Sequence, residues 1–324
     1  MAANRDWAFS PDKQPRADEL AYDLDAALDA MVLLRAEVPA DAFTAEVLGT
    51  ERAGYGVVIR PDGLVLTIGY LITEASTVWV STQRGQVVAG HPLAFDQATG
   101  LGLVQPLGRI DATPLDLGSS ATCAPGDEVV IAGHGGRAHA LAARISDKRE
   151  FAGAWEYVLD EAIFTAPAHP QWGGTALIDE HGLLCGIGSL LVQELAGNTT
   201  VQGNMVVPID LLEPILDDMR KYGRPQRPPR AWLGLYAAEA GGHLQVTGLA
   251  TGGPAERDRV QQGDLIIEVA GERVKGQADF FRKVWRLGPA GVQVPLTVGR
   301  AGDVLRLAVR SGDRADFLKK PYLH

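Results

Sequence analysis

Near the middle of the chain, residues 170–177 read Pro-Gln-Trp-Gly-Gly-Thr-Ala-Leu, and residues 178–188 continue with Ile-Asp-Glu-His-Gly-Leu-Leu-Cys-Gly-Ile-Gly. This is a Gly-Gly turn, a short apolar strand, an acidic turn that ends in Gly, and a second apolar strand. Tight turns between short apolar strands are typical of a β protein. If similar strand and turn patterns surround this stretch, they indicate a β fold for the chain as a whole.

The composition is that of a folded protein rich in turns. The chain has 324 residues, 46% apolar and 22% charged, with 38 glycines and 19 prolines. This length accommodates two domains. The formal net charge of −10 argues against a nucleic-acid partner or an anionic membrane. The two cysteines, Cys123 and Cys185, lie in apolar runs and are expected to be buried free thiols.

Short strand patterns fill most of the chain between residues 32 and 208, and Gly and Pro punctuate them, which indicates a barrel or sandwich. Before them, residues 1–16 are expected to be a loose arm, with Trp7 and Phe9 as anchoring side chains or as a subunit contact. Residues 17–34 are predicted to form an amphipathic helix. Its apolar face would carry Leu20, Leu24, Ala27, Leu28 and Met31.

A second domain is predicted after a proline-rich, basic linker at residues 223–231. The apolar stripe of residues 209–219 predicts a helix just before this linker. After it, residues 231–236 and 244–249 read as strands, residues 277–287 as a helix, and residues 292–298 and 304–309 as further strands.

The central stretch and the strands before it resemble the trypsin-like serine proteases of the HtrA/Deg family. Residues 54–67, with their Asp-Gly turn and Leu-Thr end, are similar to the family's entry to the active site. Residues 117–120 and 126–133 are similar to its Leu-Gly-Asp-Ser and Gly-Asp segments. Residues 170–177 correspond to the nucleophile segment, Gly-Asn-Ser-Gly-Gly-Pro-Leu-Val. This order of segments implies a double β-barrel over residues 31–222.

The resemblance also implies that the catalytic triad is lost. Tyr70 follows Leu-Thr-Ile-Gly at the position of the family's His, Gly100 stands at that of the Asp, and Trp172 at that of the Ser. A phenol is a poor base near neutral pH, glycine has no side chain, and an indole is no nucleophile. Gly173 and Gly174 retain the turn that carries an oxyanion hole in the family. We expect Trp172 to fill the former cleft beside Tyr70.

Other residues could rebuild a site, and these alternatives stay open at this point. His169 lies three residues before Trp172, so a displaced Ser/Thr–His pair is conceivable. His134 and His139 could suggest a metal, but no third ligand stands at a recognisable spacing, so we expect no metal and no cofactor. The hydroxyls that could serve as a relocated nucleophile are those of Thr165, Thr175 and Ser189.

Residues 232–312 resemble a bacterial PDZ domain, because Gly-Gly-Pro-Ala at 252–255 and Gly-Asp-Leu-Ile-Ile at 263–267 stand where that family has them. PDZ domains bind extended peptides along a sheet edge and capture a C-terminal carboxylate on backbone N–H groups. The resemblance places that cradle at Trp232, Leu233, Gly234 and Leu235. Of the residues on the following helix, Phe280 and Val284 are expected to be core, and Phe281 and Trp285 to line the groove.

The sequence thus predicts an all-β-dominated chain: an arm and helix (1–30), a chymotrypsin/trypsin-like double β-barrel (31–222), a linker (223–231), a PDZ domain (232–312) and a loose tail (313–324). It predicts an inactive HtrA-like pseudoprotease that binds peptides or protein C-termini. The alternatives are an active serine endopeptidase with a relocated nucleophile, or an inactive subunit of an active paralogue. The resemblance implies a possible trimer and a role in protein quality control.

No apolar run approaches the length of a membrane span, and no signal peptide follows Met1. If Met1 is the native start, a cytoplasmic location is expected; if a leader has been removed, the periplasm is expected instead.

Overall fold

The computed structural model describes residues 7–196 and 199–320. The chain divides into two compact units. The first comprises Met1–Arg149, Glu161–Pro225 and Lys319–His324, and the second comprises Glu150–Asp160 and Gln226–Leu318. Within the described residues, no helix is both long and apolar enough to cross a membrane.

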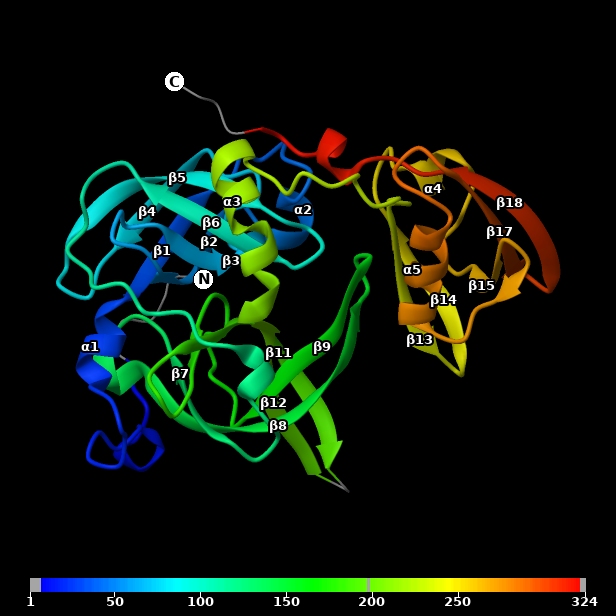
Figure 1. Ribbon diagram of the computed structural model, residues 1–324. Helices are drawn as coiled ribbons and strands as arrows, with labels where there is room; N and C mark the ends of the chain where they lie inside the picture. Colours follow the sequence, from blue (N-terminus) through cyan, green and yellow to red (C-terminus); the bar gives the residue numbers. More distant parts are fainter. Residues whose placement is uncertain (1–6, 197–198, 321–324) are drawn as a thin grey trace. The chain divides into compact units, whose positions relative to one another are not determined.

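The first unit begins with a closed six-stranded antiparallel barrel (Figure 1). Its strand order is β1-β2-β3-β6-β5-β4, so β1 closes the barrel by pairing with both β2 and β4. Apolar side chains of these strands, such as Leu66 and Val80, fill its interior. The strands are β1 (Met31–Glu37), β2 (Glu51–Val58), β3 (Val65–Ile68), β4 (Thr77–Ser81), β5 (Val87–Phe95) and β6 (Leu101–Pro106).

A second closed barrel follows in the same unit, with strand order β10-β11-β12-β9-β8-β7. Its core includes Ile131, Leu141, Leu177 and Val206, which are all fully buried. The strands are β7 (Glu128–Ala132), β8 (Ala140–Gly153), β9 (Tyr157–Ala166), β10 (Ala176–Ile178), β11 (Leu184–Ala196) and β12 (Thr199–Pro208). Two barrels of this kind confirm the predicted trypsin-like, all-β fold.

Short helical segments connect the strands of the first unit. The predicted helix at residues 209–219 is present as the turn η5 and the helix α3. The α-helices are α1 (Leu24–Asp29), α2 (Ala45–Leu48) and α3 (Glu213–Tyr222), and the 3-10 turns are η1 (Pro11–Lys13), η2 (Gly69–Leu71), η3 (Ser120–Thr122), η4 (Gly136–His139) and η5 (Ile209–Leu211).

The long N-terminal helix predicted for residues 17–34 is wrong, because only α1 is helical there. Asp23 begins the helix by accepting a hydrogen bond from the Ala26 N–H at 3.2 Å. From Met31 onward the chain enters β1, where pairing with two neighbouring strands satisfies the backbone. The apolar residues at helical spacing therefore belong to the buried face of a short helix and to the buried first residues of β1.

The second unit contains one sheet, ordered β13-β14-β15-β17-β18, with β16 paired to β15. Phe280 and Val284 are buried in its core, as predicted. The elements are β13 (Leu235–Ala240), β14 (His243–Leu249), α4 (Pro254–Arg257), β15 (Leu265–Val269), β16 (Glu272–Arg273), α5 (Gln277–Arg286), β17 (Gln293–Arg300), β18 (Asp303–Arg310) and η6 (Arg314–Phe317).

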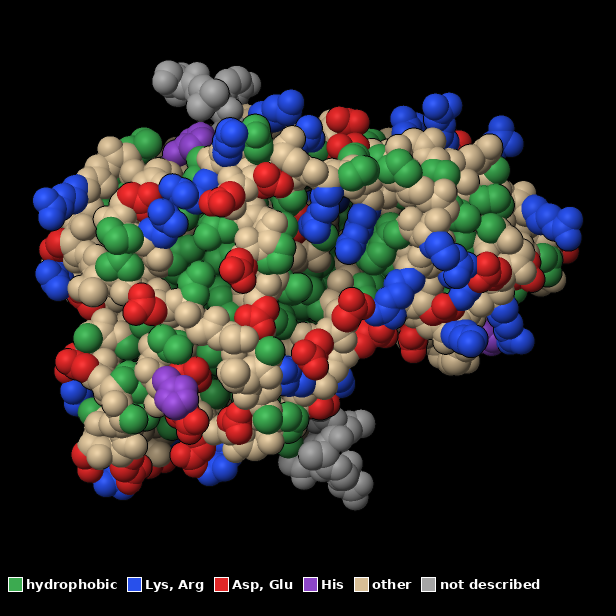
Figure 2. Space-filling model, viewed as in Figure 1, with side chains coloured by type: hydrophobic (Ala, Val, Ile, Leu, Met, Phe, Trp, Pro, Cys, Tyr) green, Lys and Arg blue, Asp and Glu red, His purple; other side chains and the backbone are tan. Residues whose placement is uncertain are grey.

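Two details of the predicted domain limits differ from the structure. The division between the units falls after Pro225, inside the predicted linker region, but the tip of the β8–β9 hairpin (Glu150–Asp160) also belongs to the second unit. The tail after residue 312 is not loose throughout, because η6 places the Phe317 ring 4.7 Å from the Trp232 ring. Figure 2 shows acidic and basic side chains interspersed on the face in view.

Candidate functional site

The Gly-Gly turn of residues 173–174 is fixed against β2 by backbone contacts. The Tyr55 N–H donates to the Gly173 carbonyl at 2.8 Å, and the Gly174 N–H donates to the Gly188 carbonyl at 2.9 Å. Gly174 has a φ of +80°, and a Cβ added there would lie 1.9 Å from the Tyr55 carbonyl oxygen. Only glycine fits this approach, so the fold itself requires the turn whether or not a reaction takes place there.

Tyr70, on η2 directly after β3, is held in place through its hydroxyl. This hydroxyl donates to the Ser189 carbonyl at 2.8 Å and lies 2.8 Å from the position that a Gly173 Cβ would take. Burial raises the pKa of the Tyr70 phenol far above its ordinary value, and a hydrogen bond from the Trp172 side chain acts in the opposite direction. The phenol therefore stays protonated and cannot act as a base.

Trp172 is half-buried, and its side chain reaches Tyr70. Its backbone carbonyl accepts hydrogen bonds from the Thr175 N–H at 3.2 Å and the Thr175 hydroxyl at 3.0 Å. The Thr175 hydroxyl thus closes the turn. Trp172 thus lies beside Tyr70, and the expectation that it fills a former cleft stays a prediction.

Gly100 closes a tight turn between β5 and β6 with a φ of +79°. Its N–H donates to the Asp96 carbonyl at 2.8 Å, and its own carbonyl accepts from the Gly69 N–H at 2.7 Å. The buried carboxylate of this turn is Asp96, which accepts from the Thr99 N–H at 3.0 Å. Gly100, which the resemblance sets at the position of the family's Asp, therefore forms a backbone turn and carries no side chain.

His169 is completely buried, and its ring is held by backbone groups. Its Nδ1 accepts from the Gln171 N–H at 3.2 Å, and its Nε2 lies 3.1 Å from the His139 carbonyl. Burial lowers the pKa of His169 to about 4, so the ring is neutral at physiological pH. Both ring nitrogens are thus engaged in structural contacts, and this arrangement does not favour a displaced Ser/Thr–His pair.

The N-terminal aromatic residues contact this histidine within the same chain. The ring centres of Trp7 and Phe9 lie 5.4 and 5.2 Å from that of His169, and Trp7 also contacts His139. They act here as anchors of the arm, and the predicted subunit contact stays a prediction. The Nε2 atom of His134 lies 3.1 Å from the Thr82 carbonyl. Among the described residues, no group of three metal-binding side chains is present.

The two cysteines are free and buried, which confirms the prediction. Their thiols are neighbours, since a hydrogen bond from the Cys185 thiol lowers the pKa of Cys123 and the same contact raises the pKa of Cys185. Cys185 also lies 3.4 Å from the Asp179 carboxylate. These contacts give neither thiol a histidine base.

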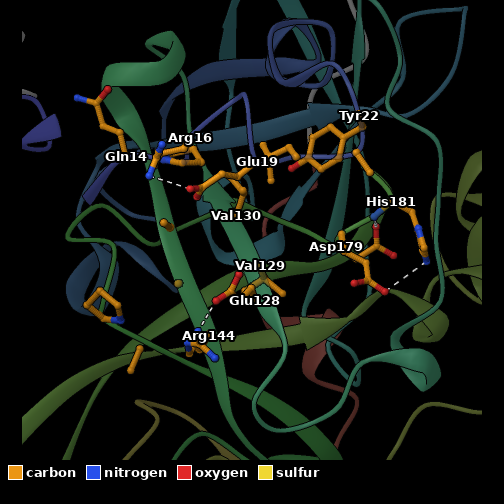
Figure 3. Close-up of a pocket in the computed structure, with 18 of the residues that line it drawn as sticks. Gln14, Arg16, Glu19, Tyr22, Glu128, Val129, Val130, Arg144, Asp179 and His181 are labelled. Atoms are coloured by element: carbon orange, nitrogen blue, oxygen red, sulfur yellow. Dashed lines mark hydrogen bonds and ion pairs between the residues drawn. The ribbon is translucent and has the colours of Figure 1, made fainter. Parts of the chain in front are cut away.

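A hollow of about 730 Å³ lies between the N-terminal arm and the second barrel (Figure 3). Charged side chains line it, and several pair with each other: Arg16 with Glu19 at 2.7 Å, and Arg144 with Glu128. These pairs neutralise one another within the first unit. The hollow does not include Tyr70, Gly100 or Trp172.

In the second unit, a group of backbone N–H donors converges on one carboxylate. The N–H groups of Leu233, Gly234 and Leu235 donate to Glu156 at 3.0, 2.7 and 3.3 Å. Gly234 has a φ of +70°. The use of these donors as a cradle for a peptide carboxylate stays a prediction. The sequence did not point to Glu156, which looks like an ordinary polar turn residue and lies 77 positions before Leu233.

The other predicted groove residues lie close to this cradle in sequence or on α5. Trp232 is buried, and Phe281 is only 1% exposed. Trp285 is partly buried and stacks on Phe281 with a ring separation of 5.9 Å, and the Arg230 guanidinium lies 4.2 Å over the Trp285 ring. Phe281 is therefore as deeply buried as the core residue Phe280, and its role in a groove stays a prediction.

Comparison with known proteins places these observations in a family context. Residues 54–187 match the family described as the trypsin-like peptidase domain. The chain is 24% identical over 282 residues to a probable periplasmic serine endoprotease DegP-like of Halomonas elongata, covering 82% of this chain and 57% of the relative. It is 26% identical over 273 residues to the serine endoprotease DegS of Haemophilus influenzae, covering 81% and 77%. The chain thus spans a little over half the length of the first of these relatives.

Solved structures agree on the fold. The chain superposes on the HtrA-type protease AlgW with tripeptide at a TM-score of 0.52 and 19% identity, covering 92% of this chain and 97% of that one. It superposes on the serine endoprotease from Yersinia pestis at 0.51 and 20% identity, covering 91% and 99%.

The names of the curated relatives correct one prediction. The cytoplasmic location expected from the first residues is wrong, because three of these relatives, from Halomonas elongata, Hahella chejuensis and Rhizobium meliloti, are named periplasmic.

Proposed function

Because the chain is related to the HtrA-type trypsin-like serine proteases, we propose that it keeps their fold without their reaction and works by binding peptides. The loss of the reaction is supported mainly by the protonated and hydrogen-bonded phenol of Tyr70. Its phenol stands where a base is needed, stays protonated, and is tied to the Ser189 carbonyl at 2.8 Å.

Peptide-bond cleavage by this fold needs a nucleophile, a base and an orienting carboxylate in one geometry. Trp172 offers no nucleophile, and Gly100 offers no carboxylate. Replacing one triad member in such enzymes already removes most of the rate, on the order of 10⁴-fold or more. With three positions substituted, we propose that no residual triad chemistry operates at this turn.

The second half of the proposal rests on the second unit, which we interpret as PDZ-like. Its edge strand β13 and the converging N–H groups of Leu233, Gly234 and Leu235 are suited to a peptide that ends in a carboxylate. A solved relative, AlgW, is described with a tripeptide and with a decapeptide. We propose that this chain likewise binds peptides or protein C-termini.

Two measurements on the full chain test the two halves separately. In the first, fluorescent casein is incubated with the wild type, and with the DegS relative as the active control; we expect hydrolysis only by the control. Turnover by the wild type that disappears when Ser189 or Thr175 is replaced by Ala would instead establish a relocated nucleophile.

In the second measurement, decapeptides ending in Leu, Val or Phe are titrated by calorimetry, each with a free carboxylate and as the C-terminal amide. We expect binding of the carboxylate forms only, because the amide lacks the charge that the N–H groups favour. Equal binding of both forms would refute the peptide-binding half while leaving the loss of the reaction untouched.

A further inference from the structure

The outer edge of β13 already carries a segment of this chain. The sheet order places β13 at an edge, with β14 on its other side. The Ala237 N–H on β13 donates to the Ala154 carbonyl at 3.3 Å. Ala154 lies at the tip of the β8–β9 hairpin, within Glu150–Asp160, so this tip takes the place that an added peptide strand would take.

The same tip supplies a carboxylate to the cradle. Glu156 Oε1 accepts from the N–H groups of Leu233, Gly234 and Leu235, and Oε2 accepts from Leu233 at 3.0 Å. The Glu156 side chain is buried, with 6% of the residue exposed. The C-terminus of a peptide would offer two carboxyl oxygens to these three backbone donors. Here the side chain of Glu156 offers them instead.

Further contacts hold the tip on both sides of Glu156. Val158 belongs to the same buried apolar cluster as Leu235 and Phe281. At the two ends of the tip, the Arg282 guanidinium on α5 pairs with both Glu150 and Asp160. The tip is therefore bound through backbone, apolar and charged contacts together, as a ligand is.

We infer that the β8–β9 hairpin tip is an internal ligand of the peptide groove, and that a peptide with a free C-terminal carboxylate binds only by displacing Glu156 from its cradle. This inference rests on the proposed peptide-binding function. The donors of the cradle cannot serve two carboxyl groups at once, because each backbone N–H has one hydrogen to donate and those of Leu233, Gly234 and Leu235 already donate to Glu156. The groove is thus self-occupied, and its apparent affinity for an external peptide is lowered by the fraction of molecules with the tip bound.

The variant Glu156→Gly isolates the carboxylate from the shape of the hairpin. Glu156 has a φ of +61°, a conformation that glycine adopts without strain, so the turn is retained while the carboxylate is removed. The matched control is Glu161→Gln on the same hairpin. Glu161 is exposed, pairs with Lys148 at 3.4 Å, and lies outside the second unit.

Hydrogen exchange of the full chain tests the internal contact without any peptide. In the wild type and Glu161→Gln, the amides of Leu233, Gly234 and Leu235 are expected to be protected. In Glu156→Gly they should exchange at least tenfold faster, while the amides of β17 keep their rates. Equal exchange of the three amides in all three proteins would overturn the inference, whether or not any peptide binds.

Competition is tested with the same carboxylate and amide decapeptides. We expect Glu156→Gly to bind the carboxylate forms at least tenfold more tightly than the wild type does, and Glu161→Gln to match the wild type. Equal affinities of wild type and Glu156→Gly for a peptide that binds would overturn the inference. If exchange accelerates but no peptide binds to either protein, the internal contact stands and the peptide-binding function fails.

Discussion

Replacing Gly174 by Ala tests why the Gly-Gly turn of residues 173–174 requires a glycine. The new Cβ would lie 1.9 Å from the Tyr55 carbonyl oxygen and 2.8 Å from the Thr67 hydroxyl, so backbone on β2 has to move. Overpacking of this kind costs roughly 1–3 kcal/mol or more. The φ of +80° adds about 1–2 kcal/mol for a residue with a side chain. We therefore expect a loss of about 2–5 kcal/mol, a large part of the roughly 5–15 kcal/mol that stabilises a typical domain.

The matched control is Gly85→Ala. Gly85 has a φ of +85°, but no heavy atom lies within 4 Å of the added Cβ. This variant pays only the backbone strain of about 1–2 kcal/mol. Urea unfolding of the full chain, followed by tryptophan fluorescence, gives both free energies. If Gly174→Ala costs no more than Gly85→Ala, then the close approach to β2 is not what fixes the glycine, and our account of the turn is refuted.

Three further predictions concern single side chains. Tyr70→Phe removes the hydrogen bond to the buried Ser189 carbonyl and should lower the free energy of unfolding by about 1–2 kcal/mol. The variant should hydrolyse no casein, like the wild type. An unchanged melting temperature would contradict the predicted loss of stability. Arg52→Met removes the guanidinium that donates to the Tyr70 carbonyl at 2.8 Å and to other buried oxygens. We expect the free energy of unfolding, measured by thermal unfolding, to fall by about 2–4 kcal/mol. A fall of less than about 1 kcal/mol would refute the role of Arg52 in holding this segment. Burial raises the pKa of Glu156 to about 7, although its backbone hydrogen bonds and the charge of Arg314 act to lower this pKa. The binding of Glu156 to the N–H groups of the cradle is therefore strongest below about pH 4.5 and weakens as the pH rises to about 7. Affinity for a carboxylate peptide should therefore rise about tenfold or more from pH 5 to pH 7.5 in the wild type and stay flat in Glu156→Gln; parallel profiles would contradict this linkage.

The sequence was informative where local pattern and fold coincide. Alternating short strands predicted the barrels. The assignment of Tyr70, Gly100 and Trp172 to the three triad positions stays a prediction. The helical reading of residues 17–34 failed for a physical reason. Met31 and Val32, the first residues of β1, are both fully buried although they point to opposite faces of the strand, so this part of the sequence has no period that separates a helix from a strand.

Glu156 could not have been predicted from the residues near it. Its partners lie 77 to 79 positions later, and nothing in Gly-Ala-Trp-Glu at residues 153–156 distinguishes a buried carboxylate from a solvated turn. The assignment of the hairpin tip to the second unit follows from this contact and its neighbours, so it also lay beyond a linear reading of the chain.

Intact-protein mass spectrometry after incubation with a fluorophosphonate is the most direct test of the claim that the protease fold is kept without its reaction. The full chain is treated at pH 8 beside the DegS relative, and any adduct is located by peptide mapping. Our account predicts an unmodified mass for this chain and a single adduct on the relative. A stoichiometric adduct on any serine of this chain would contradict it, and an adduct on Ser189 would identify the relocated nucleophile directly.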